Sequence, residues 1–464
     1  MFNKYAQMHG PIVQFKVFGQ THVVLSSGQV TNDLFVKRGT IYSDRGTPYA
    51  FGYVARDLIT ALLPKNDRWR RQRKLIHAVI SITTNAKYQE LMQREATLTL
   101  SHLLQSSEDY SRHFLRYSYG VVARSMFGVS IPSSDDKFID DNEAYINDTM
   151  DTFRPDQYPV NLVPALRFLP QWLMPSLAKM DRIRDTSIKM VSELRTHVEG
   201  HIRQGVAKES VYRDFLENRG DYDLSDEEAG YAFYGLIGGG TRSTHNALLM
   251  FVSLMMDYPE WMERLQRHVD EVVGPDRLPT WDDIPNLPMV RAVAKESVRY
   301  RSIKAELGIP HLLEKDDVYE GYFFAKGTIF HANYPAILMD KDVYPDQQPF
   351  NPARWLEASY PTYKEPLSVY PNFQNFTPFG YGRRACPGYD FAERTLVIMV
   401  AQMAWACNIT KPIDPATKKP VVITMEYEPV PNPRPKPFPC NLEARSKGRL
   451  EVLKAEGKRM EMQV

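Results

Sequence analysis

Cysteine is scarce in this sequence of 464 residues, which contains three: Cys386, Cys407 and Cys440. Three thiols cannot form a disulfide framework, so the sequence excludes the class of small secreted domains that disulfides hold together. We therefore expect a reducing environment that faces the cytosol. At this length a hydrophobic core can stabilise the fold without covalent cross-links.

An excess of charge of either sign is also missing. The 57 lysines and arginines nearly balance the 56 aspartates and glutamates, which leaves a net charge of +1. This balance excludes a general electrostatic case for binding nucleic acid or a strongly acidic partner. A protein partner that docks through charge would need a local patch.

The N-terminus has no long hydrophobic run. Its first ten residues, MFNKYAQMHG, are polar. They do not begin a stretch of 18 or more apolar residues, which is roughly the length that a membrane-spanning helix needs. The sequence therefore offers no evident N-terminal anchor.

One of the three cysteines lies in a run unlike the rest of the chain. Residues 379–388 read FGYGRRACPG, so Cys386 lies between glycines, with Arg384 two places before it. An apolar, helix-like stretch, 391–405, follows at once. A thiolate at a helix N-terminus is stabilised by unpaired backbone N–H groups and by the helix dipole. Some haem enzymes that activate O2 use an electron-rich sulfur of this kind as the ligand of iron. The alternative is that Cys386 is a buried cysteine with a structural role.

A long apolar helix is predicted between Ser225 and Pro259. Ser225 and Glu228 have the spacing of a capping box at its start. About 33 residues would span roughly 50 Å at the helical rise of 1.5 Å per residue. Glycines 238–240 lie inside it, at a cost of roughly 0.5–1 kcal/mol each. We expect a bulge, the close approach of a bulky ligand, or tight helix packing at this point.

The rest of the pattern is mostly helical, with a small β part in the first fifth and the last third of the chain. Helical periodicity dominates 66–216, although prolines interrupt it between 155 and 175, and another helix is predicted over 288–301. Short strands are predicted at 10–27 (a pair), 306–313, 318–324, 328–332, 421–425 and 450–453.

The cysteine run resembles the haem-ligand signature of the cytochrome P450 family, Phe-x-x-Gly-x-Arg-x-Cys-x-Gly. Its fixed positions correspond to Phe379, Gly382, Arg384, Cys386 and Gly388. The resemblance implies the fold of that family, mainly α with a small β part, in which a triangular helical domain carries a long central helix over the haem. It implies haem b as the cofactor, with Cys386 as the axial ligand of iron. Residues 1–464 would form a single catalytic domain that lacks the N-terminal membrane anchor.

Two further segments resemble structural elements of the same family. Glu296-Ser-Val-Arg299 has the Glu-x-x-Arg spacing, which places both side chains on one helix face. The segment Phe350-Asn-Pro-Ala-Arg354-Trp355 resembles the family element Phe-x-Pro-Glu-Arg-Phe. The resemblance implies a buried charged triad of Glu296, Arg299 and Arg354 with a structural role. A glutamate shared by two guanidiniums must be fully hydrogen-bonded, because its burial is otherwise costly.

The two propionates of haem require basic partners. Trp69-Arg-Arg-Gln-Arg73 matches the family's Trp-x-x-x-Arg, with Trp69 and Arg73 one helical turn apart. Pro310-His311 matches a Pro-His that contacts a propionate in many relatives, and Arg384 lies inside the cysteine motif. The resemblance therefore implies that Trp69, Arg73, His311 and Arg384 contact the propionates.

The resemblance extends over about residues 4–408 and is nearest in style to microsomal enzymes of fungal secondary metabolism. Such enzymes take electrons from NADPH through a flavoprotein reductase and use O2 to hydroxylate, desaturate or couple bulky apolar metabolites. We expect NADPH–cytochrome P450 reductase and a small-molecule substrate as partners, contact with a membrane surface, no nucleic acid and a monomer. Full-length relatives lie on the cytosolic face of the endoplasmic reticulum. The apolar segment 162–174 resembles the family's lid, which often dips into the bilayer; ordinary core is the alternative.

The chain departs from the family in the middle of the long helix. The family motif Ala/Gly-Gly-x-Asp/Glu-Thr-Thr/Ser reads Gly239-Gly-Thr-Arg242-Ser243-Thr244 here. In the family, the acid and the alcohol deliver protons for oxygen activation. Arginine cannot act as the acid, because its pKa stays above about 12. Ser243, Arg242 and Thr244 are therefore the candidate catalytic residues.

Three interpretations of Arg242 are open. In the first, Ser243 or Thr244 with ordered water suffices, which gives an ordinary monooxygenase. In the second, Arg242 binds the carboxylate of an acidic substrate through its bidentate fork, as in some haem-thiolate peroxygenases, and the substrate supplies acid–base function; an oxidation that needs little proton relay, such as radical coupling, belongs to the same interpretation. In the third, Arg242 points away from the haem and pairs with a neighbouring helix. A reductase-independent haem isomerase and a haem-binding partner without turnover are the alternatives from other classes.

Position along the chain also predicts residues of the substrate pocket. Relatives have mainly apolar residues after the helix at 288–301, whereas this chain has Lys304 and Glu306. Lys304 would either pair with Glu306 or meet a polar substrate. The predicted pocket residues are Phe51, Leu236, Gly239, Ile303 and Lys304.

Overall fold

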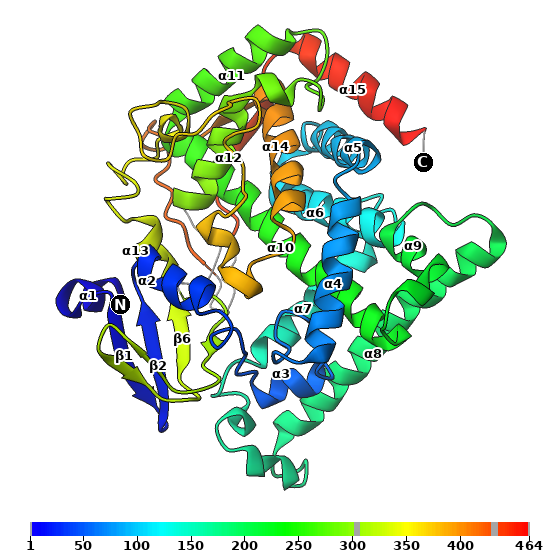
Figure 1. The fold of residues 1–464 in the computed structure, drawn as a ribbon. Helices are drawn as coiled ribbons and strands as arrows, with labels where there is room; N and C mark the ends of the chain where they lie inside the picture. Colours follow the sequence, from blue (N-terminus) through cyan, green and yellow to red (C-terminus); the bar gives the residue numbers. More distant parts are fainter. Residues whose placement is uncertain (1, 301–306, 428–434, 463–464) are drawn as a thin grey trace.

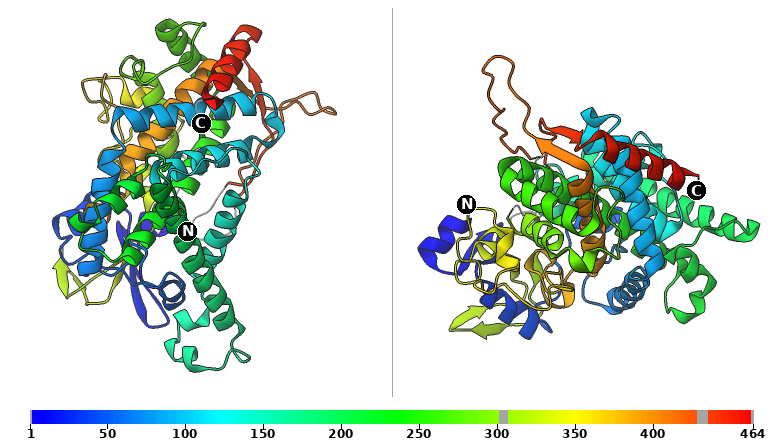
Figure 2. Two further views of the ribbon diagram at one scale, coloured as in Figure 1. Left: turned by 90° about the vertical axis from the view of Figure 1, so that its right-hand side faces the viewer. Right: turned by 90° about the horizontal axis from the view of Figure 1, so that it is seen from above.

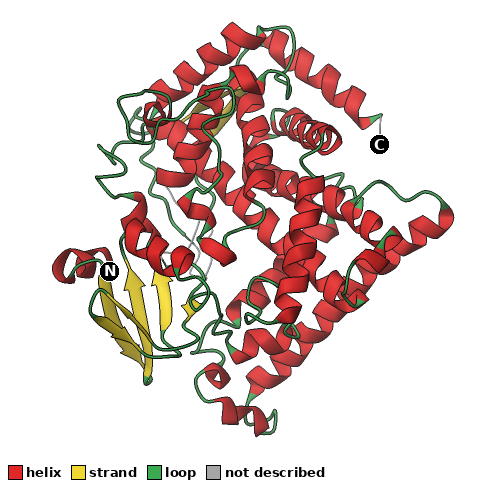
Figure 3. Ribbon diagram, viewed as in Figure 1, coloured by secondary structure: helices red, strands yellow, loops and turns green. Residues whose placement is uncertain are grey.

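The computed structural model describes residues 2–300, 307–427 and 435–462. Within these ranges the chain is mainly helical, and its largest sheet lies at one corner, beside the N-terminus (Figures 1 and 3). The helices are α1 (Phe2–His9), α2 (Gly28–Asn32), α3 (Tyr49–Val54), α4 (Asp67–Ile82), α5 (Ala86–Leu103), α6 (Tyr110–Phe127), α7 (Lys137–Asp151), α8 (Pro175–Gln204), α9 (Val211–Glu217), α10 (Asp226–Asp257), α11 (Pro259–Val273), α12 (Pro288–Tyr300), α13 (Tyr334–Leu338), α14 (Tyr389–Ala406) and α15 (Lys447–Glu461). The strands are β1 (Ile12–Val17), β2 (Gln20–Leu25), β3 (His311–Leu312), β4 (Asp317–Tyr319), β5 (Tyr322–Phe324), β6 (Ile329–Ala332), β7 (Cys407–Thr410) and β8 (Asn441–Ala444).

The main sheet pairs two strands near the N-terminus with two strands from residues 311–332. Its strand order among the described residues is β1-β2-β6-β3, with β2 and β6 parallel and the other pairs antiparallel. The strand pair predicted at 10–27 is present as β1 and β2, in which Ile12 lies opposite Leu25. Because β2 and β6 are far apart in sequence, this pairing brings residues near 311 beside the N-terminal segment.

α10 runs through the middle of the helical part (Figures 1 and 2) and packs against α4, α6, α12 and α14. The capping box predicted at its start is present, because the Ser225 hydroxyl accepts from the Glu228 N–H while the Glu228 carboxylate accepts from the Ser225 N–H. The two reciprocal bonds satisfy backbone donors that would otherwise lack partners at the helix start.

The three mid-helix glycines of α10 have different surroundings. A Cβ added to Gly240 would lie 2.9 Å from a methyl of Val122 in α6, so this glycine allows tight helix packing. A Cβ added to Gly238 would lie 4.0 Å from Ile146 in α7. A Cβ added to Gly239 would meet no heavy atom within 4 Å, and this glycine is exposed although it lies in mid-helix. Gly239 therefore borders open space.

Two short apolar segments near the C-terminus differ from the prediction. Residues 450–453, predicted as a strand, lie inside α15, and no strand is assigned over 421–425 in this described part of the chain. Leu453, Gly457 and Met460 are buried at helical spacing. A Cβ on Gly457 would lie 2.7 Å from the Ser101 hydroxyl, so α15 packs tightly on α5.

Candidate functional site

The segment before α14 holds Cys386 in a tight backbone loop. The Cys386 N–H donates to the Phe379 carbonyl over 2.6 Å, which closes the loop between the two ends of the motif. Gly382 has a φ of +56°, and a Cβ on it would lie 2.1 Å from the Phe35 carbonyl. Only glycine fits there, because other residues add both strain and a clash. Gly388 is the N-cap of α14, so the thiol lies two residues before the N-cap of this helix.

Gly388 also leaves room beside the sulfur. A Cβ added at this glycine would lie 3.9 Å from Cys386 Sγ. On the other side of the motif, the Phe379 ring packs against Phe373 with a centroid separation of 5.3 Å. The loop is thus anchored by an aromatic cluster at one end and by α14 at the other.

Arg384 and Trp69, two of the predicted propionate contacts, lie in contact with each other. The guanidinium carbon of Arg384 lies 4.2 Å from the centroid of the Trp69 ring. Its Nε donates to the Ser43 carbonyl over 2.7 Å and its Nη2 to the Leu63 carbonyl over 2.8 Å. The remaining Nη1 is buried and has no hydrogen-bond partner among the described residues. A buried cationic donor left in this way fits an anion.

Two further arginines gather around the same place. Arg73, one turn after Trp69 in α4, donates to the Ala385 carbonyl, next to Cys386. Arg45 donates to the Ala61 carbonyl over 3.2 Å and to the Pro310 carbonyl. Neither these two nor Arg384 forms an ion pair with a carboxylate of the described residues. The sequence prediction did not include Arg45, because no motif marks it.

Burial lowers the pKa of these three arginines, and repulsion between them adds to the shift for Arg45 and Arg384. Burial, with the Arg384 charge second, lowers the pKa of Arg45 to about 9. Burial lowers the pKa of Arg384 to about 10 and also lowers that of Arg73, although the Cys386 thiol acts against the latter shift. An anionic group between the arginines would relieve this repulsion.

His311 joins the cluster from β3. Its ring stacks on Phe35 with a centroid separation of 3.9 Å, and its Nδ1–H donates to the Tyr42 carbonyl over 2.7 Å. Burial, with the charge of Arg45 second, holds the pKa of His311 well below its usual value. The imidazole is therefore neutral at physiological pH.

These residues fit haem. Trp69, Arg73, Arg384 and His311, predicted as propionate contacts, lie around one place, and Arg45 adds a further cation. The Cys386 thiol lies beside Arg73, at the N-terminus of a helix. The unpartnered Arg384 Nη1 is the observation that calls for an anion at this site.

The structure also brings Glu296, Arg299 and Arg354 together, with every side chain fully buried. Arg299 donates to both Glu296 oxygens over 2.8 Å, and Arg354 Nε donates to Oε1 over 3.0 Å. Trp355, at a position where the family element has phenylalanine, donates its indole N–H to Glu296 Oε2 over 3.0 Å. The remaining arginine N–H groups donate to carbonyls of the segment 338–347. All four side chains of the cluster are thus hydrogen-bonded.

One face of α10 borders the open space. Leu236, Gly239 and Ser243 are spaced as neighbours on one helix face, and none of them is buried. The Ser243 hydroxyl donates to the Gly239 carbonyl over 2.7 Å. Thr244 is 4% exposed and lies off this face.

Arg242 is turned away from that face. It is 4% exposed, and its guanidinium contacts Glu143 and Asn147 of α7. Of the three interpretations of this residue, the contacts favour pairing with a neighbouring helix.

The other predicted pocket residues, Phe51, Ile303 and Lys304, do not define the substrate pocket further. Phe51 is buried in α3 and packs against Phe153, with 4.9 Å between ring centroids. Ile303 and Lys304 lie outside the described residues.

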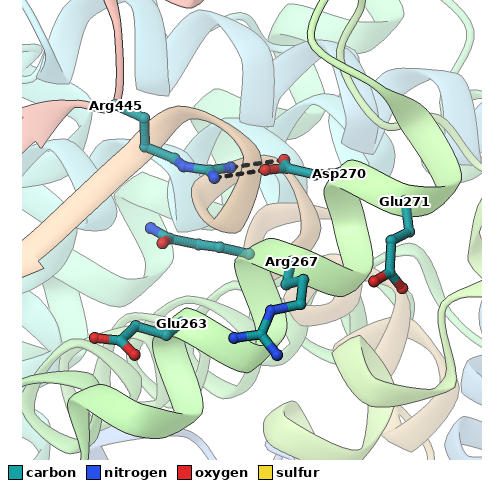
Figure 4. Close-up of a pocket in the computed structure, with 6 residues that line it drawn as sticks. Glu263, Arg267, Asp270, Glu271 and Arg445 are labelled. Carbon is teal, nitrogen blue, oxygen red and sulfur yellow. Dashed lines mark hydrogen bonds and ion pairs between the residues drawn. The ribbon is translucent and has the colours of Figure 1, made fainter.

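Two hollows in the surface of the described residues are lined by no predicted site residue. One of about 480 Å³ runs along α11 and reaches the residue after β8 (Figure 4). Asp270 is bound there by Arg445 over 2.7 Å. No predicted site residue lines this hollow, whose residues are Glu263, Gln266, Arg267, Asp270, Glu271 and Arg445.

Comparisons with known proteins agree with this geometry. The family model described as Cytochrome P450 matches residues 1–423. The chain is 50% identical over its full length to cytochrome P450 monooxygenase psoD of Aspergillus fumigatus, covering 89% of that protein. It is 32% identical to cytochrome P450 monooxygenase COX2 of Coprinopsis cinerea, over 96% of this chain and 85% of that one.

The fold agrees as well. A solved zebrafish cytochrome P450 structure with abiraterone superimposes with a TM-score of 0.76 at 20% sequence identity, covering 96% of this chain and 99% of that one. Together with the family match and the fungal relatives, this likeness leads to one conclusion: the chain belongs to the cytochrome P450 family and is a cytochrome P450 monooxygenase of fungal type.

Proposed function

We propose that the protein is a haem-thiolate monooxygenase that takes electrons from NADPH through a flavoprotein reductase and oxidises a bulky secondary metabolite. Haem b, when bound, supplies the oxygen-activating chemistry. The observation that supports this proposal is the arrangement of Cys386 at the start of α14 beside a cluster of buried arginines without carboxylate partners among the described residues.

The chain's own residues have distinct parts in this function. Cys386 would bind the haem iron through its thiolate, and Arg45, Arg73 and Arg384 would hold the propionates, with Trp69 and His311 beside them. Arg384 has one N–H group without a partner among the described residues, whereas neutral His311 already donates its Nδ1–H to the Tyr42 carbonyl, so its Nε2 would only accept a hydrogen bond.

The distal side would be formed by the face of α10 that carries Gly239 and Ser243. Ser243 keeps the hydroxyl of the family's alcohol, and its bond to the Gly239 carbonyl fixes its rotamer. We propose that Ser243 and ordered water carry protons, with Thr244 in a supporting position.

The substrate is proposed to be neutral and largely apolar. The acidic-substrate alternative requires a guanidinium that is free to bind a carboxylate. Arg242 instead has four contacts to Glu143 and Asn147 in α7. These contacts occupy the fork that an acidic substrate would use.

We expect the purified haem protein to consume NADPH in a substrate-dependent way only when a cytochrome P450 reductase is present. Substrates are selected first from a panel of apolar metabolites, phenols, acids and alkaloids by difference spectroscopy, because displacement of water near iron changes the haem spectrum. Product formed from a bound compound without reductase would favour a haem isomerase. Binding without turnover in either condition would favour a haem-binding partner, and both results would contradict the proposal.

A membrane surface is proposed as the site of action, on the cytosolic side of the endoplasmic reticulum, with the protein as a monomer. No helix among the described residues is both long and apolar enough to cross a bilayer. The segment 162–174 nevertheless exposes a group of apolar side chains at one end of the molecule (Figure 1). Phe168 is 75% and Trp172 is 78% exposed. Such a group on a monomer indicates a surface that contacts another apolar phase.

Replacing Phe168 and Trp172 together with serine is expected to weaken binding to phosphatidylcholine vesicles by at least ~10-fold, because burying each ring contributes roughly 1.5–3 kcal/mol. Flotation with vesicles measures the bound fraction. Val422→Ser is the control, since Val422 is also strongly exposed, at 88%, but lies outside segment 162–174. Equal binding of the double variant and the unchanged protein would show that segment 162–174 does not face the membrane.

A further inference from the structure

α7 has an unusual buried face. Ile139 and Ile146 lie on it, as expected for a helix that packs on a core, but Asn142 and Glu143 are buried between them. Burying a carboxylate and an amide is costly unless both are hydrogen-bonded. The partners of these two polar groups therefore decide where α7 sits.

Each of these two groups has a partner in α10, beside which α7 lies (Figure 1). The Tyr234 hydroxyl donates to Asn142 Oδ1 over 2.8 Å. Two turns further along α10, Arg242 donates from Nη2 to Glu143 Oε2 over 2.9 Å and from Nε to Oε1 over 3.3 Å. The same Nη2 donates to the Asn147 side chain over 2.6 Å and to the Glu143 carbonyl over 3.2 Å.

A third helix fixes the orientation of the carboxylate. The Tyr119 hydroxyl of α6 donates to Glu143 Oε1 over 2.9 Å. Glu143 is thus held from α6 and from α10 at once, while Arg242 has a planar fork that suits a carboxylate better than a point charge would. We call Arg242, Glu143 and Asn147 the clamp.

The clamp lies next to the open face of α10 that carries Ser243. Arg242 directly precedes Ser243, which lies on the open face of α10. At its other end, α7 leads into the exposed apolar segment 162–174 and then α8. The side chain of Ile146 in α7 lies 4.0 Å from a Cβ placed on Gly238, next to Gly239 on the open face of α10. A movement of α7 away from α10 would therefore displace the start of segment 162–174 and withdraw Ile146 from the edge of that face.

We propose that Arg242 is a positioning residue: the clamp holds α7 against α10 and thereby sets how readily small molecules enter and leave the space beside Ser243. This inference rests on the proposed function only in taking that space as the substrate chamber. It gives the arginine at the family's acidic position a role in access, in place of proton transfer or substrate binding.

The test compares Arg242→Met and Glu143→Gln with the charge-reversed pair Arg242→Glu/Glu143→Arg in the haem protein. Hydrogen exchange of residues 137–151 reports movement of α7, and stopped-flow binding of 4-phenylimidazole reports entry to the chamber. Each single variant is expected to raise both rates about tenfold, as expected for the loss of a coupled contact pair. The reversed pair is expected to recover at least about half of that change, since it restores opposite charges.

A matched control is the buried pair Arg116–Glu95, with 2.9 Å between Nη2 and Oε2, which joins α6 to α5. Glu95→Gln should leave exchange of 137–151 and azole entry unchanged, even where it lowers overall stability. Should Arg242→Met fail to retain haem, Asn147→Ala and Arg242→Lys give milder versions of the same test.

The proposal is overturned by rates within twofold of the unchanged protein in these variants, or by a reversed pair as fast as the single ones. An unchanged carbon-monoxide spectrum in all variants keeps this outcome separate from the proposed function.

Discussion

Replacing Cys386 with alanine is expected to abolish the carbon-monoxide difference spectrum of thiolate-ligated haem. Turnover should fall by at least ~10³-fold, or about 4 kcal/mol at 1.4 kcal/mol per tenfold change. The reason is geometric, because the loop closed by the Cys386 N–H and the Phe379 carbonyl presents one thiol at the start of α14. The other two cysteines cannot substitute, since burial raises the pKa of Cys407 and of Cys440 to about 12 and keeps both as neutral thiols.

Cys440→Ala is the control for this experiment. Cys440 is partly buried and forms no disulfide, so its loss should leave haem content and the carbon-monoxide spectrum as they are. A Cys386→Ala protein that still holds its porphyrin and gives the unaltered spectrum would contradict the assignment of the ligand and, with it, the proposed function.

Replacing Glu296 with glutamine is expected to lower the free energy of unfolding by roughly 3–5 kcal/mol, because it leaves two buried guanidiniums without a counter-charge. Total stabilities of domains are only about 5–15 kcal/mol, so much of the protein should be lost on expression. The amide also puts an NH2 group where Arg299 and Arg354 now donate. Urea unfolding followed by circular dichroism and by haem absorbance measures the loss.

The chain contains its own control for this substitution. Glu456 and Arg459 in α15 have the same Glu-x-x-Arg spacing, and Arg459 donates to Glu456 over 2.8 Å and 2.9 Å, but the side chains are 37% and 54% exposed. Glu456→Gln should therefore change the free energy of unfolding by no more than about 1 kcal/mol. Equal losses at positions 296 and 456 would refute the argument from burial.

These two pairs also show what sequence could and could not predict. Spacing alone does not distinguish Glu296–Arg299 from Glu456–Arg459. The segment around Arg354 does distinguish the two pairs. It resembles the family element whose arginine is buried together with the Glu-x-x-Arg pair, and no such segment accompanies Glu456–Arg459. The long central helix, its capping box and the N-terminal strand pair were likewise predictable, since each depends on residues close in sequence.

Contacts between distant segments were harder to predict. Arg45 carries no motif and reaches the cluster only because its side chain crosses to the Pro310 carbonyl. The partner of Arg242 lies 99 residues before it, in a helix whose polar residues would ordinarily be placed on the solvent side. The strand predicted at 450–453 was wrong because four apolar-rich residues were considered alone, whereas buried positions 453, 457 and 460 follow the helical period.

The contrast between Gly239 and Gly240 has a practical consequence for altering product selectivity. At position 240 any added carbon would be forced into Val122, so larger residues there would damage the protein scaffold. At position 239 an added Cβ would meet no protein atom within 4 Å. Alanine at this position would also stabilise the helix by roughly 0.5–1 kcal/mol relative to glycine. If the space beside Gly239 is the substrate chamber that we propose, a graded series of side chains at position 239 is the direct route to changing which carbon of a metabolite becomes oxidised.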